Sequence, residues 1–123
     1  MGHVYVDARI KGQRSRRVRL MVDTGATYSL VSPTVARDAG LVVSKLRDRV
    51  RLANGKIVRV PLALGQIRVG RREASTVFWV GRCDEPLLGV EALEVLGLAV
   101  DPSSGRLRPT RPYATRLGGF GRR

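Results

Sequence analysis

The chain has 123 residues, of which 43% are hydrophobic, and its 23 Lys and Arg against 10 Asp and Glu give a net charge of +13. This length fits one compact domain and is too short for two lobes of ordinary size. No apolar run approaches the roughly 18 residues of a membrane span, and the first residues lack the apolar stretch of a signal peptide. We therefore expect a cytoplasmic domain without a membrane partner.

The single cysteine and the single histidine, Cys83 and His3, exclude several kinds of chemistry. One thiol cannot form an internal disulfide, and a catalytic thiol needs a base beside it. One Cys and one His do not make a ligand cluster for a metal. We expect a structural role for Cys83, no metal site and no cofactor.

The first third of the chain predicts a hairpin and a short helix. Apolar and polar residues alternate over 4–10 and again over 16–22, as in two strands with one apolar face. Ser32 is a good N-cap, Pro33 fits the first helical position, and Gly40 is a natural stop. These signals predict a helix of about two turns.

The middle of the chain predicts two more hairpins. Asn54-Gly55 stands between two apolar segments and is a strong signal for a two-residue hairpin turn. Pro61 indicates an edge position or an irregularity in the strand that contains it. Residues 63–69 and 74–80 then predict another pair of strands.

The last third predicts a second helix and a final hairpin. Apolar residues recur at helical spacing between Val90 and Leu96, and Gly97 ends the pattern. Short strands are expected at 98–101 and 106–108. The whole pattern is typical of a small, mostly antiparallel β domain with two helical pieces.

From Pro109 onward, apolar residues no longer recur at strand or helix spacing. The segment 109–123 is rich in Arg, Gly and Pro and contains no acidic residue. We therefore assign the domain to residues 1–108 and expect 109–123 to be flexible.

A carboxylate stands at the end of a buried strand in the segment 20–32, which reads LMVDTGATYSLVS. Apolar residues precede Asp23, and Gly25 permits a tight turn and close approach of the backbone to a substrate. Such a carboxylate costs free energy unless it is hydrogen-bonded or functional. Two interpretations stay open: Asp23 is reactive, or its side chain caps a turn through hydrogen bonds to nearby backbone N–H groups.

This segment resembles the catalytic loop of the retropepsin-like aspartic proteases, the single-domain, retroviral-type family. Two further features match in order along the chain: the hairpin at 52–57 stands where the family has its flap, and Leu87-Leu88-Gly89 resembles the segment that opens the last helix. The resemblance covers roughly Val4 to Arg108. It implies a small closed antiparallel β barrel with one or two short helices.

The resemblance also implies an aspartic endopeptidase that is active as a homodimer on polypeptides. The chain contains a single Asp-Thr-Gly loop, so the second carboxylate would come from a second copy. By the family pattern, the catalytic residues are Asp23, Thr24 and Gly25, with Thr24 hydrogen-bonded across the dimer. The expected substrate-binding residues are Ala26, Ala53, Asn54, Gly55, Lys56, Leu88 and Gly89.

Two alternatives stay open. A basic nucleic-acid-binding β domain fits the charge, but no aromatic cluster stands among the basic residues, and most arginines alternate with apolar residues as on solvated strand faces. A catalytically silent dimerisation or peptide-binding module would keep the fold alone. Thr24 as an ordinary turn hydroxyl and 53–57 as an ordinary surface hairpin are open in the same way. Dimer geometry is open too, because the C-terminal segment does not resemble the terminal strands of viral members.

Overall fold

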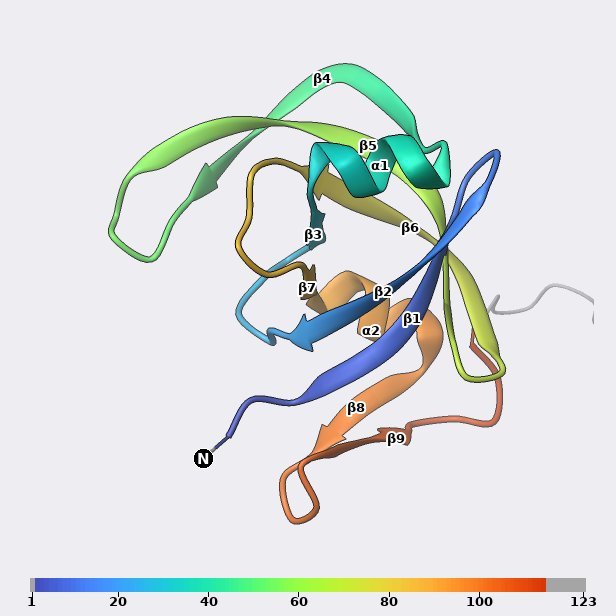
Figure 1. Cartoon of the computed structure of the whole chain (residues 1–123). Helices are drawn as coiled ribbons and strands as arrows, with labels where there is room; N and C mark the ends of the chain where they lie inside the picture. The colour runs from blue at the N-terminus through green and yellow to red at the C-terminus, as the bar shows by residue number, and fades with distance from the viewer. Residues whose placement is uncertain (1, 115–123) are drawn as a thin grey trace, which may run out of the picture.

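The computed structural model describes residues 2–114, and these form nine strands and two helices (Figure 1). The mostly β class with two short helices is confirmed. In chain order the elements are β1 (Tyr5–Lys11), β2 (Ser15–Val22), β3 (Ser29–Val31), α1 (Pro33–Ala39), β4 (Val42–Arg51), β5 (Ile57–Val69), β6 (Arg72–Val80), β7 (Leu87–Leu88), α2 (Val90–Leu96), β8 (Leu98–Asp101) and β9 (Arg106–Pro109).

Seven strands form one sheet in the order β1-β2-β7-β3-β6-β5-β4, and β1 also pairs with β5, so the pairing returns to its first strand. The pairs β2–β7 and β3–β6 are parallel and the others in this sheet are antiparallel. A mostly antiparallel arrangement was expected, and most pairings are antiparallel, but the two parallel pairs were not predicted. Hydrophobic alternation predicts strands but not their direction, and both parallel pairs join segments far apart in the chain.

The core lies inside this ring of strands and against α2. Ile10, Leu20, Ile67, Phe78 and Leu88 are fully buried. Leu93 and Leu96 of α2 belong to the same core cluster. Each such side chain contributes about 1.5–3 kcal/mol by leaving water, so α2 is held to the sheet by its apolar face.

Both helices begin and end where the sequence predicts. The Ser32 hydroxyl accepts a hydrogen bond from the backbone N–H of Val35 at 3.2 Å, and α1 ends before Gly40. α2 begins after Gly89 and ends before Gly97. The signals at these ends are local, which explains why they could be read from the sequence.

The β4–β5 hairpin is longer than predicted, and its turn is of another type. The Gly55 N–H donates to the Leu52 carbonyl at 2.9 Å, and the Leu52 N–H donates to the Lys56 carbonyl at 2.8 Å. Only Gly55 in this turn has a positive φ, +86°. The loop therefore has three residues and ends in a left-handed glycine, so the predicted two-residue turn was wrong. The irregularity expected at Pro61 is confirmed, because the β4–β5 register shifts beside it, between Val43 and Arg47.

Residues 110–114 lie against the end of α2. The Arg72 guanidinium donates to the carbonyls of Leu96 at 2.9 Å and Arg111 at 2.6 Å, and the Arg111 guanidinium donates to the carbonyl of Glu94 at 2.7 Å. Carbonyls at a helix C-terminus lack partners within the helix, and these two arginines supply them. The rest of the segment expected to be flexible, residues 115–123, lies outside the described residues. Within 2–114, no helix is long and apolar enough to cross a membrane.

Candidate active site

Asp23 follows β2 directly and opens the loop to β3. Its backbone N–H donates to the Leu88 carbonyl at 2.9 Å, and its carbonyl accepts from the Ala26 N–H at 3.1 Å. Its carboxylate Oδ1 accepts from the Gly25 N–H at 2.9 Å. The turn interpretation of Asp23 therefore holds, but it uses only one oxygen. No hydrogen bond from residues 2–114 reaches Oδ2 of this half-buried side chain.

The beginning of α2 holds the loop in place. The N–H groups of Val90 and Glu91 donate to the carbonyls of Ala26 at 2.7 Å and Thr27 at 2.9 Å. The first N–H groups of a helix have no partner within the helix, so here they bind the loop instead. The structure thus places Gly89 against Ala26 in the Asp23 loop, and both belong to the predicted substrate-binding residues.

Gly89 allows an unusually close approach between β7 and the loop. A Cβ at this position would lie 2.5 Å from the carbonyl carbon of Tyr28. The Gly89 N–H donates to the buried Ser29 hydroxyl at 3.0 Å. Sequence reasoning missed Ser29, although a lone hydroxyl between Tyr28 and the apolar pair Leu30-Val31 is a readable signal of a buried polar contact.

The candidate residues near the loop differ in their exposure. Thr24 and Gly25 are exposed, whereas Ala26 and Gly89 are buried. Leu88 is fully buried in the core of the single chain. The surface that Asp23 offers to a ligand is therefore made by Thr24 and Gly25, with the other three residues beneath it.

The predicted flap residues form the tip of the β4–β5 hairpin. Ala53, Asn54, Gly55 and Lys56 are all exposed, and no hydrogen bond among the described residues joins them to the Asp23 loop. In Figure 1 this hairpin and the β2–β3 loop project toward the same side of the view. In the single chain, the tip is therefore not tied to the Asp23 loop by hydrogen bonds.

A chain of contacts connects the stem of that hairpin to the site. The Trp79 indole N–H donates to Oδ2 of Asp48, on β4, at 2.9 Å. The Trp79 ring also meets the ring of Tyr28 edge-on, with centroids 5.4 Å apart and an interplanar angle of 80°. Sequence reasoning missed this connection, because the three residues are far apart in the chain.

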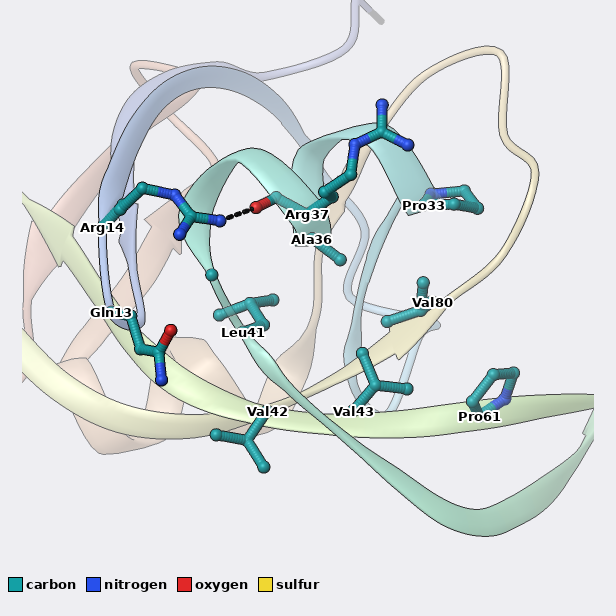
Figure 2. A pocket seen from close by; sticks show the side chains of 11 residues that line it. Gln13, Arg14, Pro33, Ala36, Arg37, Leu41, Val42, Val43, Pro61 and Val80 are labelled. Atoms are coloured by element: carbon teal, nitrogen blue, oxygen red, sulfur yellow. Dashed lines mark hydrogen bonds between the residues drawn. The ribbon is translucent and has the colours of Figure 1, made fainter.

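Three surface cavities of the chain contain none of the candidate site residues. The largest of these three, about 710 Å³, lies between α1 and the β4–β5 pair and is lined by apolar residues such as Val42, Val43 and Pro61. Figure 2 shows Arg14 at its rim, donating to the Arg37 carbonyl. It contains no reactive constellation, so the Asp23 loop stays the candidate site.

The described residues offer little for metal or thiol chemistry. No group of three or more His, Cys, Asp and Glu within 2–114 is placed to hold a metal ion. Burial raises the pKa of the Cys83 thiol, and the nearby charge of Asp84 raises this pKa further. A raised pKa keeps the thiol protonated and unreactive, which supports the structural role expected for Cys83.

Comparison with known families points to the same loop. A family model described as aspartyl protease matches residues 6–92. The match runs from β1 into α2 and contains the Asp23 loop, the β4–β5 hairpin and Gly89. No curated protein matches the chain significantly.

Proposed function

Because the chain belongs to the aspartyl protease family, we propose that it is an aspartic endopeptidase that acts on polypeptides as a homodimer. One observation carries the proposal. The Asp23 carboxylate has one oxygen held by the Gly25 N–H at 2.9 Å, while the other oxygen has no hydrogen-bond partner among residues 2–114. A carboxylate that is oriented in this way and still has a free oxygen can take a proton from a bound water.

The reaction requires two carboxylates that share one proton. The ionised one takes a proton from the attacking water, and the protonated one donates a hydrogen bond to the scissile carbonyl. Water oxygen then bonds to the carbonyl carbon, and the amide nitrogen leaves with a proton from the dyad. The chain has one Asp-Thr-Gly loop, so the second carboxylate is Asp23 of a second copy across a two-fold axis.

The roles of the other site residues follow from whether their side chains are exposed or buried. The Thr24 hydroxyl is exposed and makes no hydrogen bond within the described residues, so it is available to bond across the axis beneath the dyad. Gly25, without a side chain, lines the cleft. Ala26, Leu88 and Gly89 are buried and support the loop from below. The return of β1 to β5 supports the small barrel expected for this family.

The β4–β5 hairpin supplies the cover of the cleft. Its tip, from Ala53 to Lys56, is exposed and makes no hydrogen bond to the Asp23 loop within the described residues, as expected for a segment that closes on a substrate. An extended peptide between this tip and the Asp23 loop would be held by backbone hydrogen bonds. Such contacts bind polypeptides with modest dependence on sequence.

The experiment is a peptidase assay on an unfolded protein at acid pH with two variants. Asp23→Asn removes the ionisable group and keeps the shape, so cleavage should be lost, with the thermal unfolding curve little changed. Asp84→Asn removes an equally charged but exposed residue outside the site and should cleave like the wild type. A pepstatin-like transition-state mimic should inhibit the wild type. Full activity of Asp23→Asn would end the proposal, and an inactive wild type would favour the silent module.

A further inference from the structure

Three arginines lie in a row across β2, β1 and β5. Arg9 of β1 is directly paired with Arg17 of β2 and with Arg68 of β5. Ile10 and Ile67, their neighbours along the strands, are fully buried. Side chains alternate between the two faces of a strand, so the three arginines share the outer face, on strands about 4.8 Å apart. We call this set the arginine row (Arg9, Arg17, Arg68).

No member of the row forms an ion pair within the described residues, and Glu73, which stands opposite Arg68 on β6, pairs with Lys11 instead. The ion pairs between residues 2–114 are Lys11–Glu73 and Arg16–Asp38, and neither includes a member of the row. Arg9 donates to the Ser15 hydroxyl at 3.1 Å and Arg68 to the Gly70 carbonyl at 3.0 Å, and both acceptors are uncharged. Like charges directly opposite each other in a sheet destabilise it, so the row costs stability that a bound anion would recover.

The row also lines a concave surface. Its three side chains share a shallow cavity of about 340 Å³ with Asp7, Ala8 and Gly70, and Asp7 is the single acidic group of that lining. At one end Arg19 stacks on the ring of Tyr5, 4.4 Å from its centroid, which occupies that aromatic face. The hollow therefore offers guanidinium groups but no open ring on which a base could stack.

We propose that the arginine row is a docking surface for the phosphate backbone of nucleic acid, separate from the peptidase site. A guanidinium group matches phosphate with two parallel hydrogen bonds, and a line of three such groups fits the closely spaced charges of a nucleic-acid backbone. The net charge of +13 raises the local concentration of any polyanion at the surface. Without a stacking surface, recognition rests on phosphates, so binding is independent of base sequence.

The test compares two triple variants of the full chain in binding a fluorescently labelled DNA duplex of about 20 base pairs at several salt concentrations. One variant is Arg9→Gln/Arg17→Gln/Arg68→Gln. The matched control, Arg82→Gln/Arg106→Gln/Arg108→Gln, removes the same charge from exposed positions outside the row. The salt dependence of the binding constant should become shallower by about 2–3 in the row variant, since each phosphate contact contributes about 0.9 to the slope.

The affinity at low salt should fall at least tenfold in the row variant and by much less in the control. An equal loss in both variants would show that net charge, and not the row, binds the duplex, and absence of wild-type binding would also overturn the proposal. Polyglutamate of matched charge serves as a second probe. If it binds the row as tightly as the duplex does, an acidic polypeptide replaces nucleic acid as the partner and the proposal fails. Neither readout depends on peptidase activity.

Discussion

At the scale of single residues, the site depends on a few backbone contacts around Asp23. The sequence shows the carboxylate and its glycine, because Asp-Thr-Gly between apolar runs is a local pattern. It does not show that Asp23 N–H bonds to the Leu88 carbonyl, or that Gly89 must lack a side chain so that the backbone of Tyr28 can pass. Those facts depend on which distant segments meet, so only the structure supplies them.

The Ser29 hydroxyl contributes to the contacts that support the Asp23 loop. It is fully buried and accepts the hydrogen bond of the Gly89 N–H at 3.0 Å. Ser29→Ala leaves this buried N–H without a partner, which costs about 1–3 kcal/mol of unfolding free energy. The measurement is denaturant unfolding, with Ser75→Ala, at an exposed position on β6, as the control that should stay near the wild type. A Ser29→Ala protein as stable as the wild type would show that the bond contributes nothing.

At the scale of elements, the sequence predicted the ends of the helices better than it predicted which strands pair and in which direction. The helix ends at Ser32, Gly40 and Gly97 could be predicted because a cap depends on neighbours within one turn. The parallel β3–β6 pair could not be predicted, because strand direction in a sheet depends on contacts between distant segments. The arginine row was hidden for the same reason, since its members are adjacent only after β1 has paired with both β2 and β5.

One side-chain contact holds the stem of the β4–β5 hairpin. Asp48 on β4 accepts the Trp79 indole N–H at 2.9 Å and so fixes the stem beneath the free tip. Asp48→Ala removes the acceptor, whereas Asp48→Asn keeps a carbonyl oxygen with the same change of charge. We expect hydrogen exchange in residues 49–58 to speed up about tenfold in the Ala variant, the effect of losing about 1.4 kcal/mol of local stability, and less in the Asn variant.

Peptide cleavage should follow the same order, with the Asn variant closer to the wild type. A loose stem leaves the tip in more conformations, so the closed form over a substrate becomes less populated. Identical exchange rates and identical kinetics in the two variants would contradict a role for this contact in holding the hairpin.

At the scale of the whole molecule, the proposed activity depends on a second copy of the chain. The single chain presents one Asp-Thr-Gly loop, and none of the three cavities described above is lined by it. Two carboxylates brought together repel each other unless they share a proton, so assembly takes up a proton and is favoured at acid pH. Activity should therefore fall from acid toward neutral pH, and specific activity should rise with enzyme concentration near the dimer dissociation constant.

The most direct measurement is a mixing experiment. A fixed amount of wild type is mixed with an equal amount of Asp23→Asn chains, and cleavage is measured after the subunits have exchanged. If the active species needs two Asp23 carboxylates, random pairing leaves about half of the original activity, because half of the wild-type chains sit in mixed dimers. Mixing with active Asp84→Asn chains should instead raise total activity. Activity unchanged by Asp23→Asn chains would mean that one chain works alone, and this would contradict the account.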